Sequence, residues 1–341
     1  MAQINKPNTY FNTILYTGDG TDPRAITGVG FQPDFVWNKP RSSANSHALL
    51  DSVRGATKFL SSDVTDAEYT YTNSLQSFDS DGFTCGGNFS FNQNTVTYVS
   101  WNFLASNTTA SNTDGSITST VSANTTSGFS IVSYTGTGAN ATVGHGLGSA
   151  PAFIIVKSRS STDWWITYHK SNGATKYMPL NFTNAVATNS GIWNDTEPTS
   201  SVFSIGTNGG TNGSGNNYIA YCFAEKKGFS KFGSYTGNGN ADGTFIYTGF
   251  KPAWIMRKDT TQINEWTLID STRSPFNQTN QTLVPNASDI EDGDFDIDIL
   301  SNGFKCRTSE SAHNQSGVNY IYMAFAENPL VGTNNIPATA R

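Results

Sequence analysis

The sequence predicts an all-β protein built from three tandem copies of one β-sandwich or jelly-roll-like domain. Apolar residues recur in short alternating runs separated by Gly, Asn, Ser and Thr, which is typical of short strands joined by turns. No window keeps apolar residues at helical spacing beyond about two turns. A set of strand and turn motifs also occurs three times at matching spacing, which indicates a tandem repeat.

The repeat begins with Tyr-Thr-Gly, at Tyr16, Tyr134 and Tyr235. In each copy a proline follows 17 residues after the tyrosine, and a lysine follows six residues after the proline. The prolines are Pro33, Pro151 and Pro252, and the lysines are Lys39, Lys157 and Lys258. A short apolar run lies between each proline and its lysine, so each copy places a strand there.

The next motif is Asp51 followed by Arg54, matched in the third copy by Asp270 and Arg273. This spacing predicts an internal salt bridge that stabilises a turn. The second copy departs from the pattern, because His169 stands at the aspartate position. An Asp-Gly-Phe or Asn-Gly-Phe turn follows in copies one and three and resembles turns of concanavalin-like sandwiches. An aromatic strand then closes each copy, beginning at Tyr98, Tyr218 and Tyr320.

These motifs set the domain boundaries. They are an N-terminal docking segment 1–9, repeat 1 at 10–105, a Ser/Thr/Asn-rich linker 106–126, repeat 2 at 127–224, repeat 3 at 229–327 and a C-terminal tail 328–341. Within the linker, residues 117–121 could add a strand. The second junction is only a few residues long, so we expect copies two and three to pack together and copy one to have more freedom. Alternation within each copy predicts strands with one buried face.

Composition excludes several classes of function. Charged residues make up 13% of the chain, the net charge is −6, and the Lys and Arg residues are scattered, which argues against a nucleic-acid partner. No apolar run approaches the roughly 18 residues that a membrane span needs. The N-terminus lacks the pattern of a secretory signal, so we expect synthesis in the cytoplasm. Three cysteines without close spacing predict buried free thiols and no metal knuckle.

The sequence nominates no catalytic residues and no cofactor. Its four histidines, His47, His145, His169 and His313, occupy no position shared by all three copies. A nucleophile elbow, a phosphate-binding loop, a zinc-protease motif and a dinucleotide fingerprint are absent from the sequence. A glycan-cleaving enzyme would need two convergent carboxylates, and no pair is matched across the copies. We therefore expect a protein without enzymatic activity.

The candidate ligand-binding residues are aromatic. Trp164, Trp165, Tyr168 and His169 gather several rings in one short segment, and Trp266 lies near the matching place in the third copy. Neighbouring strand residues point to opposite faces, so only one of Trp164 and Trp165 can face the core. Core or interface packing and a sugar-binding site are both compatible with these rings.

The candidate metal site is acidic. Asp294, Asp296 and Asp298 would place three carboxylates on one face of a strand, and Ca²⁺ prefers such oxygen ligands. The spacing does not fit an EF-hand loop. The alternative is a solvated strand face that prevents edge-to-edge pairing.

Two segments resemble a known repeat. Residues 134–157 (YTGTGANATVGHGLGSAPAFIIVK) and 218–239 (YIAYCFAEKKGFSKFGSYTGNG), together with the opening INKPNTYFNT, resemble virion-associated proteins of marine and cyanobacterial tailed phages. The resemblance implies a structural protein of the virion surface, either a capsid decoration or a tail appendage such as a fibre. Its partners would be major capsid or tail proteins, with the N-terminal segment as a docking arm. We also expect a homo-oligomer. The alternative is a lectin-like module that binds a host surface glycan or receptor during adsorption.

Overall fold

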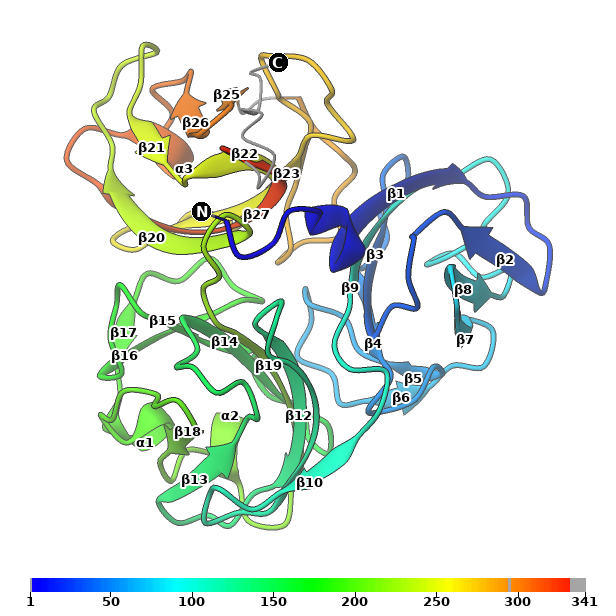
Figure 1. Ribbon diagram of the computed structural model, residues 1–341, viewed down its shortest axis with the longest axis vertical. Helices are drawn as coiled ribbons and strands as arrows, with labels where there is room; N and C mark the ends of the chain where they lie inside the picture. The colour runs from blue at the N-terminus through cyan, green and yellow to red at the C-terminus, as the bar shows by residue number, and fades with distance from the viewer. Residues whose placement is uncertain (1, 294–295, 332–341) are drawn as a thin grey trace.

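The computed structural model describes residues 2–293 and 296–331. The protein is all-β, with 42% strand and 5% helix, and its strands form several antiparallel sheets. Figure 1 shows the strands gathered in three groups around a common centre. We call residues 10–105, 127–224 and 229–327 units 1, 2 and 3. Within the described ranges, the helices are too short to cross a bilayer.

Unit 1 has a four-stranded sheet in the order β1-β9-β3-β4, a three-stranded sheet β2-β8-β7 and the pair β5-β6. The 3-10 helix η1 (Pro7–Thr9) precedes it. The strands are β1 (Phe11–Thr17), β2 (Arg24–Thr27), β3 (Phe35–Pro40), β4 (Ala48–Asp51), β5 (Lys58–Phe59), β6 (Tyr69–Thr70), β7 (Leu75–Asp79), β8 (Gly82–Cys85) and β9 (Thr97–Phe103).

Unit 2 belongs to an eight-stranded sheet, β10-β11-β12-β19-β14-β15-β16-β17, which faces the pair β13-β18. Its elements, with the two strands that precede it, are β10 (Ala110–Asn112), β11 (Ser119–Asn124), β12 (Phe129–Thr135), β13 (Ala141–Gly144), β14 (Phe153–Ser158), β15 (Ile166–His169), β16 (Lys176–Pro179), β17 (Ala187–Thr188), α1 (Ser190–Trp193), β18 (Val202–Ile205), α2 (Gly209–Asn212) and β19 (Asn217–Phe223).

Unit 3 has a five-stranded sheet, β20-β27-β22-β23-β24, and a three-stranded sheet, β21-β26-β25. Its elements are β20 (Ser230–Thr236), β21 (Phe245–Tyr247), β22 (Phe250–Asp259), β23 (Thr267–Asp270), β24 (Thr282–Leu283), β25 (Ile297–Leu300), β26 (Gly303–Cys306), α3 (Ser311–Asn314) and β27 (Asn319–Pro329). The last strand thus continues two residues into the predicted tail, of which residues 332–341 lie outside the described ranges.

The recurring tyrosines explain why the first and last strands of each unit pair. In β1–β9, β12–β19 and β20–β27, the tyrosine of Tyr-Thr-Gly lies opposite the first tyrosine of the closing strand. The two rings stack at 5.1, 5.2 and 4.9 Å between centroids in units 1, 2 and 3. Stacked aromatic pairs across an antiparallel ladder stabilise its register. The motif therefore sets the same pairing three times.

Two turn glycines have a steric role. Gly82 begins β8 and Gly303 begins β26, and each is the glycine of its Asp-Gly-Phe or Asn-Gly-Phe motif. A Cβ atom on Gly82 would lie 2.0 Å from the carbonyl oxygen of Ile26, and one on Gly303 would lie 2.0 Å from that of Ile246. Only glycine permits this close approach to the neighbouring strand. The turn motif recurs because the backbones touch there.

The large sheets are buried on both faces, which corrects the expectation of one buried face. All six residues of β3 and all six of β14 are buried. In β3, Val36 points to the small sheet of its own unit, whereas Phe35 and Trp37 point to the centre of the molecule. The second buried face arises because the three units pack against one another.

Residues from all three units share one central hydrophobic core. At its heart lie Phe103, Phe223 and Phe325, the last aromatic residue of each closing strand. Their ring centroids are 5.8, 5.3 and 6.0 Å apart in the three pairings. The expectation that copy one has more freedom is therefore wrong, because unit 1 contributes to this core on the same terms as units 2 and 3.

The linker 106–126 is not a spacer. Its strands β10 and β11 extend the sheet of unit 2, with Val121 opposite Val132. Val121 is buried, and the hydroxyl of Ser119 donates to the carbonyl of Gly144 at 2.7 Å. The strand expected at 117–121 is thus present, at Ser119–Asn124. Polar composition misled the prediction because short strands tolerate Ser and Thr once a sheet supplies backbone partners.

The N-terminal segment packs on its own chain. Ile4 and Pro7 are buried, and Ile4 joins the central core. Gln3 and Lys227 exchange hydrogen bonds of 2.9 and 2.8 Å, which tie the segment to the junction between units 2 and 3. Residues 2–9 therefore do not extend as a free docking arm.

Candidate functional site

The contacts between units repeat three times around the centre. Matching residues in the three units, His47, Trp165 and Trp266, are buried and each bonds a main-chain carbonyl of another unit. A ring N–H is a donor that burial obliges to find a partner. The bonds run from His47 to Val284 at 2.9 Å, from Trp165 to Ser61 at 2.8 Å and from Trp266 to Pro179 at 2.9 Å. Together they close a cycle of three units.

A buried Asp–Arg pair lies beside two of these contacts, as predicted. Arg54 binds Asp51, and Arg273 binds Asp270, with all four side chains buried. Each aspartate also accepts a hydrogen bond from the closing strand of another unit. Asp51 accepts from the hydroxyl of Tyr221 at 2.8 Å, and Asp270 accepts from the indole N–H of Trp101 at 3.0 Å. The two Asp–Arg pairs therefore stabilise the contact between units as well as the turn within each unit.

The third contact replaces this arrangement. The closing-strand residue that matches Trp101 and Tyr221 is Met323, which has no N–H or O–H donor. The position that matches the two aspartates is His169, whose ring Nε2 lies 3.1 Å from the carbonyl oxygen of Tyr322. An aspartate opposite Met323 would be a buried carboxylate without its donor, which is costly. The second copy therefore has His169 in place of the aspartate because the residue that faces it is Met323.

Ion pairs connect the same interfaces on the outer side. Glu68 receives bonds from Arg54 and Arg159, and Glu291 receives bonds from Arg273 and Arg41. At the third interface the matching residues are Thr260 and Val186, which share only the main-chain bond from Val186 N to Thr260 O at 3.0 Å. Units 2 and 3 are joined by a different carboxylate: Glu225, in the junction, pairs with Lys170 of unit 2 at 2.5 Å and with Lys231 of unit 3 at 2.7 Å.

The three recurring lysines also have structural positions. Lys39, Lys157 and Lys258 are fully buried, and each ammonium donates to the main-chain carbonyl of the residue that follows it. Lys157 also reaches the carbonyl of Thr65 in unit 1 at 3.1 Å, and Lys39 reaches that of Ser288 in unit 3 at 3.4 Å. Burial lowers the pKa of each ammonium to about 8, against the opposing effect of nearby carboxylates.

Three histidines use both ring nitrogens internally. In each of them Nδ1 accepts a hydrogen bond. The donor to His47 is the indole N–H of Trp37, the donor to His145 is the amide of Leu147, and the donor to His169 is the amide of Ser171. Nε2 then carries the proton and donates to a carbonyl. Burial lowers the pKa of all three rings, that of His169 to about 4. These rings are neutral, occupied and shielded from solvent, so they have no free nitrogen for acid–base chemistry.

The predicted aromatic cluster is separated by burial. Trp165, Tyr168, His169 and Trp266 are at most 3% exposed, so they cannot stack on a ligand from solvent. This corrects the expectation of a ligand site at those four residues. Trp165, His169 and Trp266 contact another unit, and the hydroxyl of Tyr168 donates to Glu197. Trp164 alone of the five is accessible, at 38% exposure, and packs edge-on against Phe182 at 5.3 Å.

The predicted acidic site is not assembled within the described residues. Asp294 lies outside them. Asp298 in β25 pairs with Arg307 at 3.3 Å, and the main-chain carbonyl of Asp296 accepts from the amide of Arg307 at 2.9 Å. Across residues 2–293 and 296–331, no group of three or more His, Cys, Asp or Glu side chains could hold a metal ion.

Sequence reasoning missed the charged residues that bridge units. Arg41 and Arg159 each stand two residues after a recurring lysine, and that shared spacing was the available signal. Their partners, Glu68 and Glu291, lie in loops whose lengths differ between copies, so no fixed spacing identifies them. The three cysteines, by contrast, are buried free thiols as predicted.

Comparison with known proteins identifies a family but no activity. Residues 6–329 match a family described as a domain of unknown function (DUF7483). No curated protein matches the chain.

Proposed function

The chain belongs to the family described as a domain of unknown function (DUF7483), and from its architecture we propose a non-enzymatic structural protein of a phage virion surface. It would serve as a capsid decoration or as a tail appendage such as a fibre. The observation that carries the proposal is the common core of the three units, centred on Phe103, Phe223 and Phe325. A chain closed on itself in this way is a rigid block with outward-facing loops, which suits a surface component.

We further propose that the three units are copies of one β-sandwich domain. The matching strand pairs, stacked tyrosines and cyclic contacts support a common origin for the units. In each unit a large sheet packs against a small one through its outer face. Such two-layer packing is the basis of sandwich folds.

The virion assignment rests on the resemblance of residues 134–157 and 218–239 to phage repeats. Capsid or tail proteins would be its partners, and the virion its location. Buried, internally bonded histidines and lysines support the absence of catalysis, since the usual acid–base groups are engaged in the scaffold.

Cryo-electron microscopy of purified particles from cells that express the protein tests this proposal. We expect density for a block of three lobes at a fixed place on the capsid lattice or the tail. Absence of the protein from washed particles, with the intact chain recovered only from the soluble lysate, would contradict it. The expected homo-oligomer is checked separately by light scattering of the purified chain.

A second candidate function is binding of a host surface glycan or receptor. It is favoured by the open ring pair Trp164 and Phe182, each more than a third exposed. Exposed aromatic faces stack on sugar rings and are otherwise unfavourable in water. The two functions are compatible, because an appendage can be structural and bind a glycan.

A further inference from the structure

Unit 1 contains an open aromatic cavity that the sequence did not nominate. It has a volume of about 120 Å³ and lies between the β5–β6 pair and the loop before β9. Tyr69 and Phe89 line it and are 46% and 43% exposed, whereas Phe59 beneath them is buried. The Phe59 and Tyr69 rings lie 5.2 Å apart, and Tyr71 lies 6.3 Å from Phe89. The cavity is therefore bordered by a continuous aromatic surface.

A buried hydroxyl without a partner lies at the same cavity. Ser90 is fully buried and lines the cavity, and its Oγ has no hydrogen-bond partner among the described residues. Leaving a buried polar group unsatisfied costs about 1–3 kcal/mol. Asp66 lines the same cavity and is exposed. Rings, hydroxyl and carboxylate together offer both apolar contact and hydrogen bonds to one ligand.

The other two units show that the fold does not require these residues. The closing-strand tyrosines Tyr98, Tyr218 and Tyr320 each donate to a carbonyl nine residues earlier, at Phe89, Gly209 and Ser311. These bonds align the loops residue by residue. Ser90 thus corresponds to Gly210 and Ala312, neither of which carries a hydroxyl.

The same reasoning applies to Tyr69. It follows Glu68, whose amide donates to Arg159 O, as those of Val186 and Glu291 donate to Thr260 O and Arg41 O. The residues that match Tyr69 are therefore Ala187 and Asp292. Only unit 1 combines the two rings with the unpaired hydroxyl, although all three units form the same strands.

We propose that this cavity binds one neutral sugar ring of a surface glycan, an inference that rests on the second candidate function above. Ligand pockets for drug-sized molecules occupy roughly 300–1,000 Å³, so this smaller cavity suits a single ring better than a peptide. Its described lining contains Asp66 but no lysine or arginine, which disfavours an anionic ligand. A sugar ring stacks its C–H face on Tyr69 or Phe89 and presents hydroxyls to Asp66, and its entry must open the lining for a hydroxyl to reach the fully buried Ser90.

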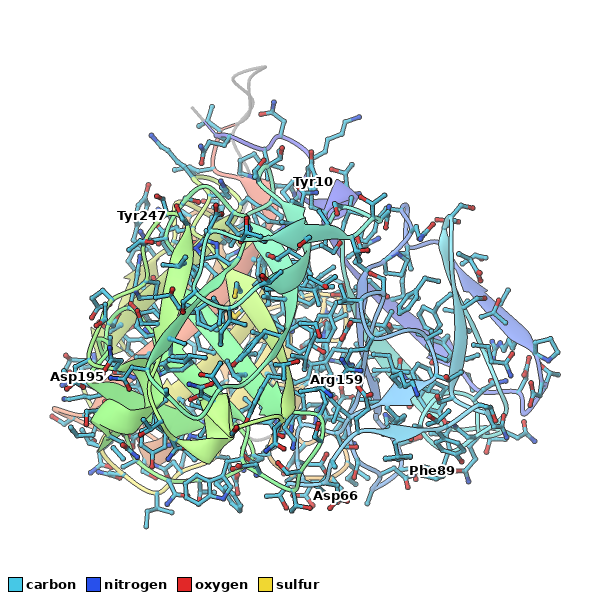
Figure 2. All side chains as sticks on the ribbon, turned by 90° about the horizontal axis from the view of Figure 1, so that it is seen from below. Tyr10, Asp66, Phe89, Arg159, Asp195 and Tyr247 are labelled. Carbon is cyan, nitrogen blue, oxygen red and sulfur yellow. The ribbon has the colours of Figure 1, made fainter. Side chains whose placement is uncertain are left out.

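The position of the cavity is suitable for recognition. Figure 2 shows Asp66 and Phe89 at the end of the molecule opposite Tyr10 and Tyr247. The residues that line the cavity thus lie at the end away from Tyr10 and the N-terminal helix. The loop that contains Asp66 also meets unit 2, because Asp163 N donates to Thr65 O at 2.9 Å. Trp164, the next residue, is exposed, so an accessible ring of unit 2 flanks this contact between the units.

Saturation-transfer NMR on the full chain tests the proposal, with methyl glycosides of glucose, galactose, mannose and N-acetylglucosamine as probes. We expect transfer to at least one glycoside with a Kd of order 1 mM, the range of a weak single-ring contact. Absence of transfer to all four at about ten times that concentration would overturn it. Transfer to a phenylalanine-containing tripeptide alone would also overturn it in favour of a peptide site.

Each cavity variant introduces the residue that unit 2 or unit 3 has at the matching position. Tyr69→Ala, Phe89→Ser and Ser90→Ala should each weaken glycoside binding about tenfold or more. Ser90→Ala should leave the unfolding temperature unchanged or raise it, because the hydroxyl has no partner to lose. Tyr247→Ala removes a 58% exposed ring at the opposite end and should leave binding unchanged. Equal binding by wild type and all three cavity variants would refute the site.

These measurements do not involve particles. Failure of glycoside binding therefore leaves the structural proposal to be decided by microscopy, and absence from particles leaves the sugar site to be decided by NMR.

Discussion

At the residue scale, the matched positions 51, 169 and 270 show how a partner selects a side chain. Asp51 and Asp270 are buried, and each has an arginine and a ring donor within hydrogen-bond distance. His169 faces the closing strand that carries Met323 and bonds a main-chain carbonyl of that strand. A buried charge is tolerated only where both its counter-ion and its donor are present.

Replacing His169 with aspartate should therefore be strongly destabilising. Neither an arginine three residues later nor a ring donor is available, since Asn172 and Met323 occupy those positions. We expect the free energy of unfolding to fall by about 3–5 kcal/mol. Urea titration measures it. Tyr221→Phe, which removes a donor from Asp51, should cost about 1–3 kcal/mol, whereas Met323→Leu should cost less than about 1.5 kcal/mol. Equal losses for the last two variants would contradict this account.

The buried histidine also predicts a pH dependence. Burial lowers the pKa of His169 from 6.5 to about 4. Between these values the unfolded chain binds more protons than the native one, so the free energy of unfolding falls as the pH is lowered through this window. The slope from this residue is at most about 1.4 kcal/mol per pH unit.

The measurement is the difference between wild type and His169→Asn in urea unfolding at pH 4 to 7. Subtracting the two curves cancels the pH dependence of groups that both proteins contain. Asp34 and Asp63 are such groups: burial raises their pKa values, so their contribution to the free energy of unfolding increases as the pH is lowered. A difference that is constant with pH would show that His169 does not titrate as described.

At the scale of elements, backbone pairing outweighs composition. The segment 106–126 has the polarity of a spacer, yet β10 and β11 continue the largest sheet. Likewise, the acidic residues at the start of β25 are divided between an ion pair at Asp298 and a main-chain bond at Asp296. An edge strand needs only one apolar side chain in two and a neighbour with free amides and carbonyls.

Hydrogen exchange distinguishes this strand from a spacer. We expect the amides of β11 (Ser119–Asn124) that bond to β12 to exchange at least about a hundredfold more slowly than those of the exposed turn 238–242. Mass spectrometry of peptic fragments resolves the two segments. Val121→Asp should abolish the difference, because it buries a charge beside Val132. Rapid exchange of both segments in the wild type would restore the flexible-linker interpretation.

At the scale of the whole molecule, the common core makes the three units depend on one another. Each unit alone would expose the aromatic face that now meets at Phe103, Phe223 and Phe325. A single unit has its own outer core between its large and small sheets, but the other buried face of each large sheet belongs to the centre. Exposed apolar faces of that size favour association over a stable monomer.

The protein should therefore unfold in one cooperative transition. Calorimetry is expected to give equal calorimetric and van't Hoff enthalpies, because the units share a core and cyclic bonds. Phe325→Ala should reduce the free energy of unfolding of the whole chain by about 3–5 kcal/mol. The unfolding temperature should fall accordingly, and no second transition should appear. Separate transitions for the three units would show that the central core is not cooperative.

The sequence by itself determined the all-β class, the threefold repetition, the Asp–Arg pairs and the buried thiols. Each of these depends on short-range spacing or on identical residues at matching positions, which sequence displays directly. The tertiary structure decided the rest. It buried Trp165 and Trp266 between units, incorporated the linker into a sheet, folded residues 2–9 onto the body and placed Tyr69 beside Phe89.

These features depend on which face of a strand meets another unit, and local alternation is the same for a strand that faces solvent and one that faces a neighbour. Closure around a centre adds a second buried face to strands such as β3 and β14. That closure is produced by contacts between residues about 100 positions apart, such as Trp165 with Ser61. Hydrophobic burial is non-directional and depends on the total apolar area removed from water, so only the assembled chain shows where it occurs.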